Sequence, residues 1–233
     1  MKNRYAFINS FSFSLIFKLF VLGIASFSLY LHIDIDDLPN TFRFFGYFTV
    51  LSNLFCFIIL LLNIIKMIYN RISFSEKYTA LKEYSHFFVL FKGMSLMSII
   101  LTFFIFHYMV ANYKYPLLIN NILNLPIKDL LPLFYVIDWL LFAPKGLQKL
   151  NAPFIWTLYP FVYLIFTFVR LYQVPESSYF HLNEAPYFFL DINKLGYERV
   201  TIFSIIILFI ILSIGYLIIG IEKIMCILQN RKL

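Results

Sequence analysis

Residues 200–221, VTIFSIIILFIILSIGYLIIGI, decide the fold class of this chain. The stretch carries no charged residue and matches the ~20 apolar residues that a helix needs to cross the hydrocarbon core of a bilayer. Five more stretches are similarly apolar, at residues 11–31, 42–65, 87–111, 126–142 and 153–174. The sequence therefore predicts an all-α, polytopic integral membrane protein, a six-transmembrane-helix bundle that forms a single domain over residues 1–233.

The composition excludes a soluble globular domain. Hydrophobic residues make up 61% of the chain and charged residues 13%, and the mean hydropathy is +0.82. Soluble domains are about one-quarter charged. The first apolar stretch is too long for a signal peptide, and residues 29–34 offer no small-residue cleavage site. We therefore expect it to remain as the first helix.

Lysine and arginine side chains gather on one side of the predicted bundle. With the N-terminus inside, the cytoplasmic ends hold Lys2, Arg4, Lys66, Arg71, Lys77, Lys82, Lys145, Lys149, Lys223, Arg231 and Lys232. This bias predicts a multi-pass protein of the cell membrane with both termini cytoplasmic and residues 175–199 outside. The net charge of +7 then reflects topology and contact with membrane lipid. No nucleic-acid partner is predicted, and the oligomeric state stays open.

The span at 126–142 is the least regular of the six. It is short, has Lys128 and Asp129 in its first turn, and carries Pro132 in its interior. We expect Pro132 to kink this helix, and Pro160 to kink the span at 153–174. A re-entrant segment is the alternative for 126–142. The run at 187–190 is too aromatic for a free loop and is expected to pack at the membrane interface.

Motifs for cofactors and metals are missing from the sequence. Cys56 and Cys226 lie far from any histidine or second cysteine, and no glycine-rich phosphate loop, H-E-x-x-H or G-x-S-x-G motif occurs. We therefore predict no cofactor and no metal ion.

Polar groups at membrane depth are the candidates for function, because they are costly to place there. From a rise of ~1.5 Å per residue, Thr49 lies roughly 10 Å below the outer end of its span. His107 and Arg170 each lie roughly 6 Å deep, and Arg43 and Lys128 lie nearer the outer surface. These groups are expected to form a polar layer in the outer half of the bundle.

Gly46, Thr49 and Asn53 follow i, i+3, i+7 spacing, so they share one helix face. A hydroxyl and an amide beside a glycine would form a niche with a nucleophile and a hydrogen-bond donor. The alternative is that these small polar residues only pack helices together.

A buried ion pair is predicted between Asp138 and Lys92. Both lie roughly 6–8 Å from the inner ends of their spans, so antiparallel neighbours would bring the two charges level. Lys18, slightly deeper, is the fallback partner. We interpret the pair as structural, the alternative being a functional proton site.

Four segments resemble one known family. Residues 43–53 (RFFGYFTVLSN) are similar to the F-T-x-x-S-N segment of a family of six-helix membrane proteins. Residues 132–142 (PLFYVIDWLLF), 156–160 (WTLYP) and 186–197 (PYFFLDINKLGY) look like its bacterial branch. Its animal members are the androgen-induced proteins, intramembrane threonine hydrolases of fatty acid esters of hydroxy fatty acids.

The resemblance implies that Thr49 occupies the position of the family's catalytic threonine. The family's catalytic histidine lies four or five residues before the proline that matches Pro132, where this chain has Lys128 and Ile127. His107 or Lys128 would then serve as the base, since a threonine hydroxyl needs one nearby.

Three functions follow from these residues. In a lipid ester hydrolase, Thr49 attacks, Asn53 donates to the oxyanion, and Arg170 or Arg43 holds a fatty-acid carboxylate. In a non-catalytic bundle, the same residues serve packing while the protein binds lipid or a partner. A transporter is the third and weaker hypothesis.

Overall fold

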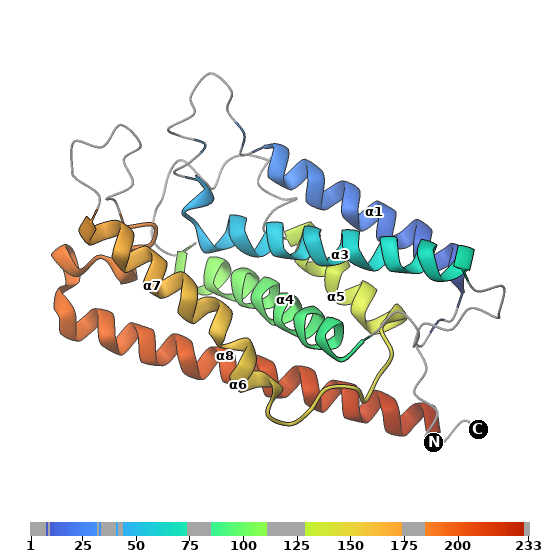
Figure 1. Cartoon of the computed structure of the whole chain (residues 1–233). Helices are drawn as coiled ribbons and strands as arrows, with labels where there is room; N and C mark the ends of the chain where they lie inside the picture. The colour runs from blue at the N-terminus through green and yellow to red at the C-terminus, as the bar shows by residue number, and fades with distance from the viewer. Residues whose placement is uncertain are drawn as a thin grey trace.

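A computed structural model describes residues 8, 10–31, 33, 41, 44–73, 85–110, 129–173 and 185–230. These residues form an elongated bundle of helices (Figure 1). The elements are α1 (Phe11–Tyr30), α3 (Phe48–Ser73), α4 (His86–Ile105), the π-helix η2 (Phe106–Val110), α5 (Leu131–Phe142), α6 (Ala152–Trp156), α7 (Leu158–Gln173), the 3₁₀-helix η5 (Phe188–Leu190) and α8 (Ile192–Asn230). The all-α prediction is confirmed.

Five helical stretches in the described part of the chain are long and apolar enough to cross a membrane. They are Phe11–Tyr30, Phe48–Ile72, His86–Tyr108, Ala152–Leu171 and Ile192–Leu228. By the length and composition of its helices, the chain is a multi-pass membrane protein. Helix α5 has only 12 residues, about 18 Å of rise, so a sixth crossing stays a prediction.

Helix α4 is the centre of the bundle. It contacts α3, α5, α6, α7 and α8, and most of its side chains are buried. Helix α1 packs on α3 and α5 at the edge of the bundle. The buried core therefore lies around α4. Exposed apolar side chains cover the outer faces of α1, α7 and α8.

The start of α3 differs from the prediction. The helix begins at Phe48 rather than at residue 42, because the chain turns at Gly46 and Tyr47. The Gly46 carbonyl accepts a hydrogen bond from the Tyr163 hydroxyl at 3.0 Å, which fixes this turn against α7. Thr49 consequently lies in the first turn of α3 and not two turns inside a longer helix.

The two prolines act differently from each other. Pro132 lies in the first turn of α5 and does not kink it, because the first turn needs no backbone donor there. Pro160 follows a break at Thr157, where α6 ends and α7 begins. Since proline lacks the amide proton that would bond the carbonyl of Trp156, the predicted kink is confirmed as a break between two helices.

The described termini of the bundle lie together. Helix α1 begins and α8 ends at the same end of the molecule (Figure 1). We call it the basic end, because Arg71, Lys149 and Lys223, which are predicted to be cytoplasmic, lie there. The opposite end, where η5 and the start of α8 lie, is the acidic end.

Single cysteines test the predicted orientation. Leu150, 60% exposed, lies at the basic end, and Lys194, with its side chain 81% exposed, lies at the acidic end. Because lysine and arginine favour the cytoplasmic side, we expect Leu150→Cys to react with a membrane-impermeant maleimide only from that side. Lys194→Cys should react only from outside. The reverse pattern would refute the orientation.

Candidate functional site

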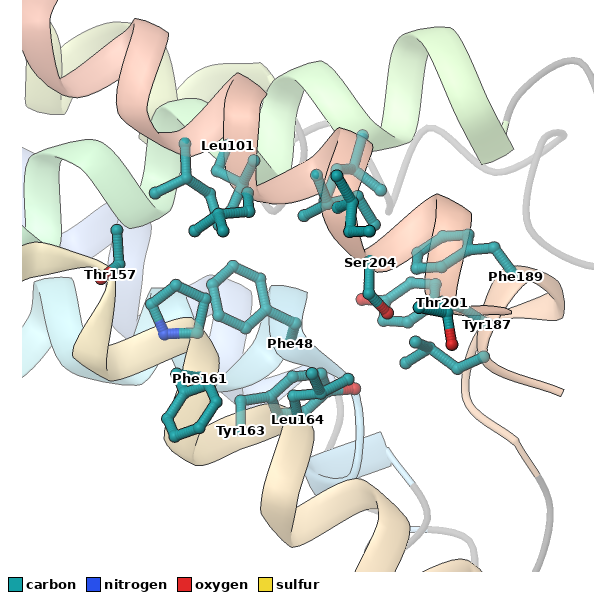
Figure 2. A pocket seen from close by; sticks show the side chains of 17 residues that line it. Phe48, Leu101, Thr157, Phe161, Tyr163, Leu164, Tyr187, Phe189, Thr201 and Ser204 are labelled. Atoms are coloured by element: carbon teal, nitrogen blue, oxygen red, sulfur yellow. The ribbon is translucent and has the colours of Figure 1, made fainter. Parts of the chain in front are cut away.

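An apolar groove of about 320 Å³ lies between α7 and α8 near the acidic end (Figure 2). Leu101 and Ile105 of α4 line it together with Phe48 at the start of α3. Phe161 of α7 and Leu208 of α8, both about half exposed, stand at its rim. The groove therefore runs between two helices that could cross a membrane and opens among residues suited to hydrocarbon.

The hydroxyl groups that line the groove are already hydrogen-bonded. Thr157 donates to the carbonyl of Phe154 at 2.6 Å. Thr201 and Ser204 donate to the carbonyls one turn earlier on α8, at 2.8 and 2.9 Å. Since each of these side chains bonds to its own helix, the groove presents an essentially apolar surface to an occupant.

Tyr187, in the segment that leads into η5, closes one end of the groove. Its ring stacks on Phe189 with 5.1 Å between the centroids. Its hydroxyl lies 3.2 Å from Thr49 Oγ1 and accepts the Thr49 amide proton at 3.3 Å. The predicted nucleophile therefore lies directly behind the side chain that ends the groove.

Tyr187 does not supply the missing base. Burial raises the pKa of its hydroxyl to about 12, so the phenol stays protonated at neutral pH. A protonated phenol can donate a hydrogen bond to Thr49 or to a developing oxyanion, but it takes no proton from the threonine.

Thr49 and Asn53, predicted to share one niche on α3, form hydrogen bonds with different parts of the structure. The Asn53 amide donates to Ser28 Oγ of α1 at 2.9 Å, whereas Thr49 faces Tyr187. Ser52, between them, bonds the Phe48 carbonyl and lies 2.7 Å from Thr102 Oγ1 of α4. The bonds of Asn53 and Ser52 therefore link α3 to α1 and α4, which favours helix packing as the role of these two residues.

His107 pairs with a carboxylate. Its Nε2 lies 3.0 Å from Asp129 Oδ1, just before α5, and its ring lies against Phe103 with 4.3 Å between the centroids. The imidazole is 37% exposed. Within the described residues, His107 thus contacts α4, η2 and the residue before the start of α5, and it makes no such contact with α3.

The predicted cationic residues are only partly described. Arg170 is buried in the last turn of α7, near enough to Tyr163 to interact electrostatically. Arg43 and Lys128 lie outside the described residues. Of the predicted carboxylate-binding residues, Arg170 is thus the one that the described part of the chain includes, and it acts on Tyr163, which lines the groove.

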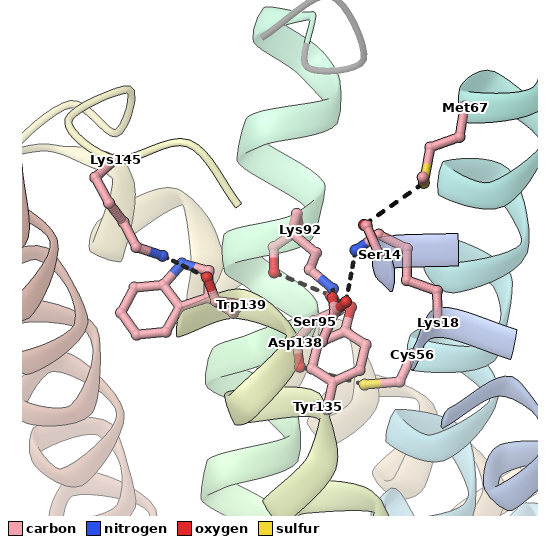
Figure 3. A network of polar contacts seen from close by, with 10 residues as sticks. All are labelled: Ser14, Lys18, Cys56, Met67, Lys92, Ser95, Tyr135, Asp138, Trp139 and Lys145. Carbon is pink, nitrogen blue, oxygen red and sulfur yellow. Dashed lines mark hydrogen bonds and ion pairs between the residues drawn. The ribbon is translucent and has the colours of Figure 1, made fainter. Parts of the chain in front are cut away.

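Asp138 lies between two lysines (Figure 3). Its carboxylate is 2.5 Å from Lys18 Nζ and 2.9 Å from Lys92 Nζ, with all three side chains at most 2% exposed. Lys92 Nζ also lies 3.7 Å from the ring centre of Tyr135. The structure thus brings Lys92 to Asp138 as predicted, and adds the fallback partner Lys18 at the same time.

The roles of Tyr187 and Asp129 were not predicted. Tyr187 belongs to the aromatic run at 187–190 and to the resembling segment 186–197, but neither signal indicated its contact with Thr49. The sequence indicates only that Asp129 lies near a helix start. It gives no sign that its carboxylate contacts His107. Within the described residues, no three His, Cys, Asp or Glu side chains could hold a metal ion together.

Comparison of the chain with family models, curated proteins and solved structures finds no match. The resemblance to the androgen-induced proteins therefore stays a prediction from the four segments quoted above. The fold and the groove stand on the structure alone.

Proposed function

We propose that this chain is an intramembrane lipid-binding protein that holds an acyl chain in the groove between α7 and α8. The observation that carries the proposal is an apolar groove, bounded by helices long enough to cross a membrane, whose hydroxyls are satisfied internally. Its volume falls at the lower end of the ~300–1,000 Å³ typical of ligand sites. A polar ligand would find few partners there, whereas a hydrocarbon chain needs none.

Selectivity would come from the polar end of the groove. Bilayer lipid tails are as apolar as the groove, so moving a chain into it gains little from the hydrophobic effect. Thr49 and Tyr187 meet at the groove's end, and Arg170 interacts electrostatically with Tyr163, which lines the groove. A hydroxyl or carboxylate at the head of the lipid would be recognised by these side chains, with charge-assisted bonds from Arg170 the stronger ones.

Two leucines of α8 offer a matched test of lipid binding. Leu208 lines the groove, whereas Leu217 is exposed and is not among the lining residues. We expect a diazirine-tagged fatty acid in vesicles to crosslink to groove residues, and Leu208→Trp to reduce this crosslinking at least several-fold by filling the groove. Leu217→Trp should leave it unchanged. Equal crosslinking in the two variants would contradict the proposal.

Ester hydrolysis is the second function, favoured by the carboxylate–imidazole contact between Asp129 and His107. A carboxylate that orients an imidazole is the arrangement that activates a hydroxyl in many hydrolases. In this proposal Thr49 Oγ1 bonds the ester carbonyl carbon as its proton passes to His107. The alcohol then leaves with that proton, and water releases the acyl group. The imidazole must come within ~3 Å of Thr49 Oγ1 for this step.

Thr49→Ala separates the two functions. If the protein is a hydrolase, this variant should lose turnover of a vesicle-embedded lipid ester by orders of magnitude, because it lacks the nucleophile. Thr49→Ser, which keeps a hydroxyl, should retain measurable turnover. Unchanged turnover in Thr49→Ala would refute hydrolysis by Thr49 and would leave acyl-chain binding standing.

A further inference from the structure

The connection between α5 and α6, residues 143–151, folds into the basic end of the bundle. Gln148 Nε2 donates to the Val89 carbonyl of α4 at 2.6 Å. Gly146 has φ = 75°, and a Cβ built on it would lie 3.0 Å from Cys226 Sγ of α8. We call residues 143–151 the basic-end loop; it touches both α4 and α8.

Lys145 is the buried cation of this loop. Its side chain is fully buried, and its Nζ donates to the Trp139 carbonyl and lies 4.1 Å from the centre of the Trp139 ring. Of the charged groups that act on Lys145, Glu222 of α8 has the largest effect, and it accepts hydrogen bonds from loop amides at 146–148. The loop thus binds a buried carboxylate through its backbone amides and carries a buried lysine that the same carboxylate stabilises electrostatically.

The charges that act on Lys145 do not balance. They come from Glu222 of α8, Asp138 of α5, Lys92 of α4 and Lys18 of α1. With Lys145, this set holds three lysines and two carboxylates, and none of the five residues is more than 3% exposed. One positive charge is therefore left over in the interior, where an uncompensated charge is costly.

We propose that Lys145 is a proton-binding site that controls docking of the basic-end loop. Docking of the loop is strongest when Lys145 is neutral, and a proton on Lys145 weakens it. Deprotonation removes the unbalanced charge without any change in packing, because an amine occupies nearly the same volume as an ammonium. Of the three lysines, Lys145 alone lies on a connection between helices, so it can reach solvent by local undocking.

The direction of the pH effect follows from the two states of the loop. Burial lowers the pKa of Lys145 to about 7, against the opposing effect of Glu222. In an undocked loop the lysine pKa is ~10.4, as in water. Between these values the docked state holds fewer protons, so docking strengthens as pH rises, by up to about tenfold per pH unit. Below pH 7 both states are protonated and docking becomes independent of pH.

Hydrogen exchange of the purified protein, measured on the peptide covering 143–151, reports loop opening directly. After correction for the chemical exchange rate at each pH, we expect protection to rise roughly tenfold from pH 7.5 to 8.5 and to stay level below about 6.5. Residues 185–191, at the acidic end, should show no such rise. A flat wild-type profile between pH 7 and 9 would overturn the proposal.

Three variants make the test specific. Lys145→Met should lose the pH dependence, whereas Lys149→Met, which removes an exposed lysine of the same loop, should keep it. Glu222→Gln removes the carboxylate that favours the charged form of Lys145. The rise in hydrogen-exchange protection should therefore begin at a lower pH. A Lys145→Met profile identical to wild type, or a Glu222→Gln rise that begins at a higher pH, would also overturn the proposal.

Discussion

Asp138→Asn is expected to lower the free energy of unfolding by about 3–5 kcal/mol and to remove most of the folded protein. The carboxylate is the shared counter-ion of Lys18 and Lys92. Asparagine keeps the shape but not the charge, so two ammonium groups would stay buried without compensation. Removing one partner of a buried ion pair costs far more than the pair itself contributes.

Thermal unfolding in detergent and the yield of monodisperse protein measure this effect. Asp129→Asn is the matched control, because Asp129 also pairs with a basic side chain but is 33% exposed. Exposed pairs contribute ~0–1 kcal/mol, so the control should unfold near the wild-type temperature.

A compensating variant separates charge from shape. Replacing Lys18 and Lys92 by methionine in the Asp138→Asn protein removes both uncompensated charges and keeps most of the volume. We expect this triple variant to regain much of the lost stability. If Asp138→Asn folded as well as wild type but lost lipid binding or turnover, the cluster would be functional rather than structural.

Depth along a helix was predictable from the sequence, and rotation about its axis was not. Counting residues from the span ends placed Asp138 level with Lys92, because the helical rise is constant. The same counting offered Lys18 only as a fallback partner, and it could not show that both lysines would contact the Asp138 carboxylate at once. It also failed for Thr49, because the chain turns at Gly46 and the helix begins later than the apolar run does.

The groove and the fold of the basic-end loop could not be predicted from the hydropathy and charge pattern of the sequence. The groove depends on the relative position of α7 and α8. The direction of α7 is set by the break at Thr157, and Pro160 was the only sign of that break in the sequence. In the sequence, Lys145 contributed only to the lysine and arginine bias that predicts the cytoplasmic side. Its burial comes from a loop that folds back onto α8, and hydropathy carries no information about such a contact.

The close approach of α4 and α6 at Gly93 gives the second large effect. A Cβ on Gly93 would lie 2.2 Å from Trp156 Cζ2 and 2.6 Å from Gln148 Nε2. Gln148 is a flexible side chain, but the indole is rigid, fully buried and fixed by a hydrogen bond from Nε1 to the Leu90 carbonyl at 3.1 Å. One added methyl group must therefore push the two helices apart or break that bond.

We expect Gly93→Ala to destabilise the bundle by about 1–3 kcal/mol, the usual cost of overpacking. Gly220→Ala on α8 is the matched control, because nothing lies within 4 Å of a Cβ there. Alanine is the better helix former by ~1 kcal/mol, so this variant should equal or exceed the wild-type stability. The same chemical change thus has opposite signs at two helical positions. Equal unfolding temperatures for the two variants would show that α4 and α6 do not meet as closely as the structure places them.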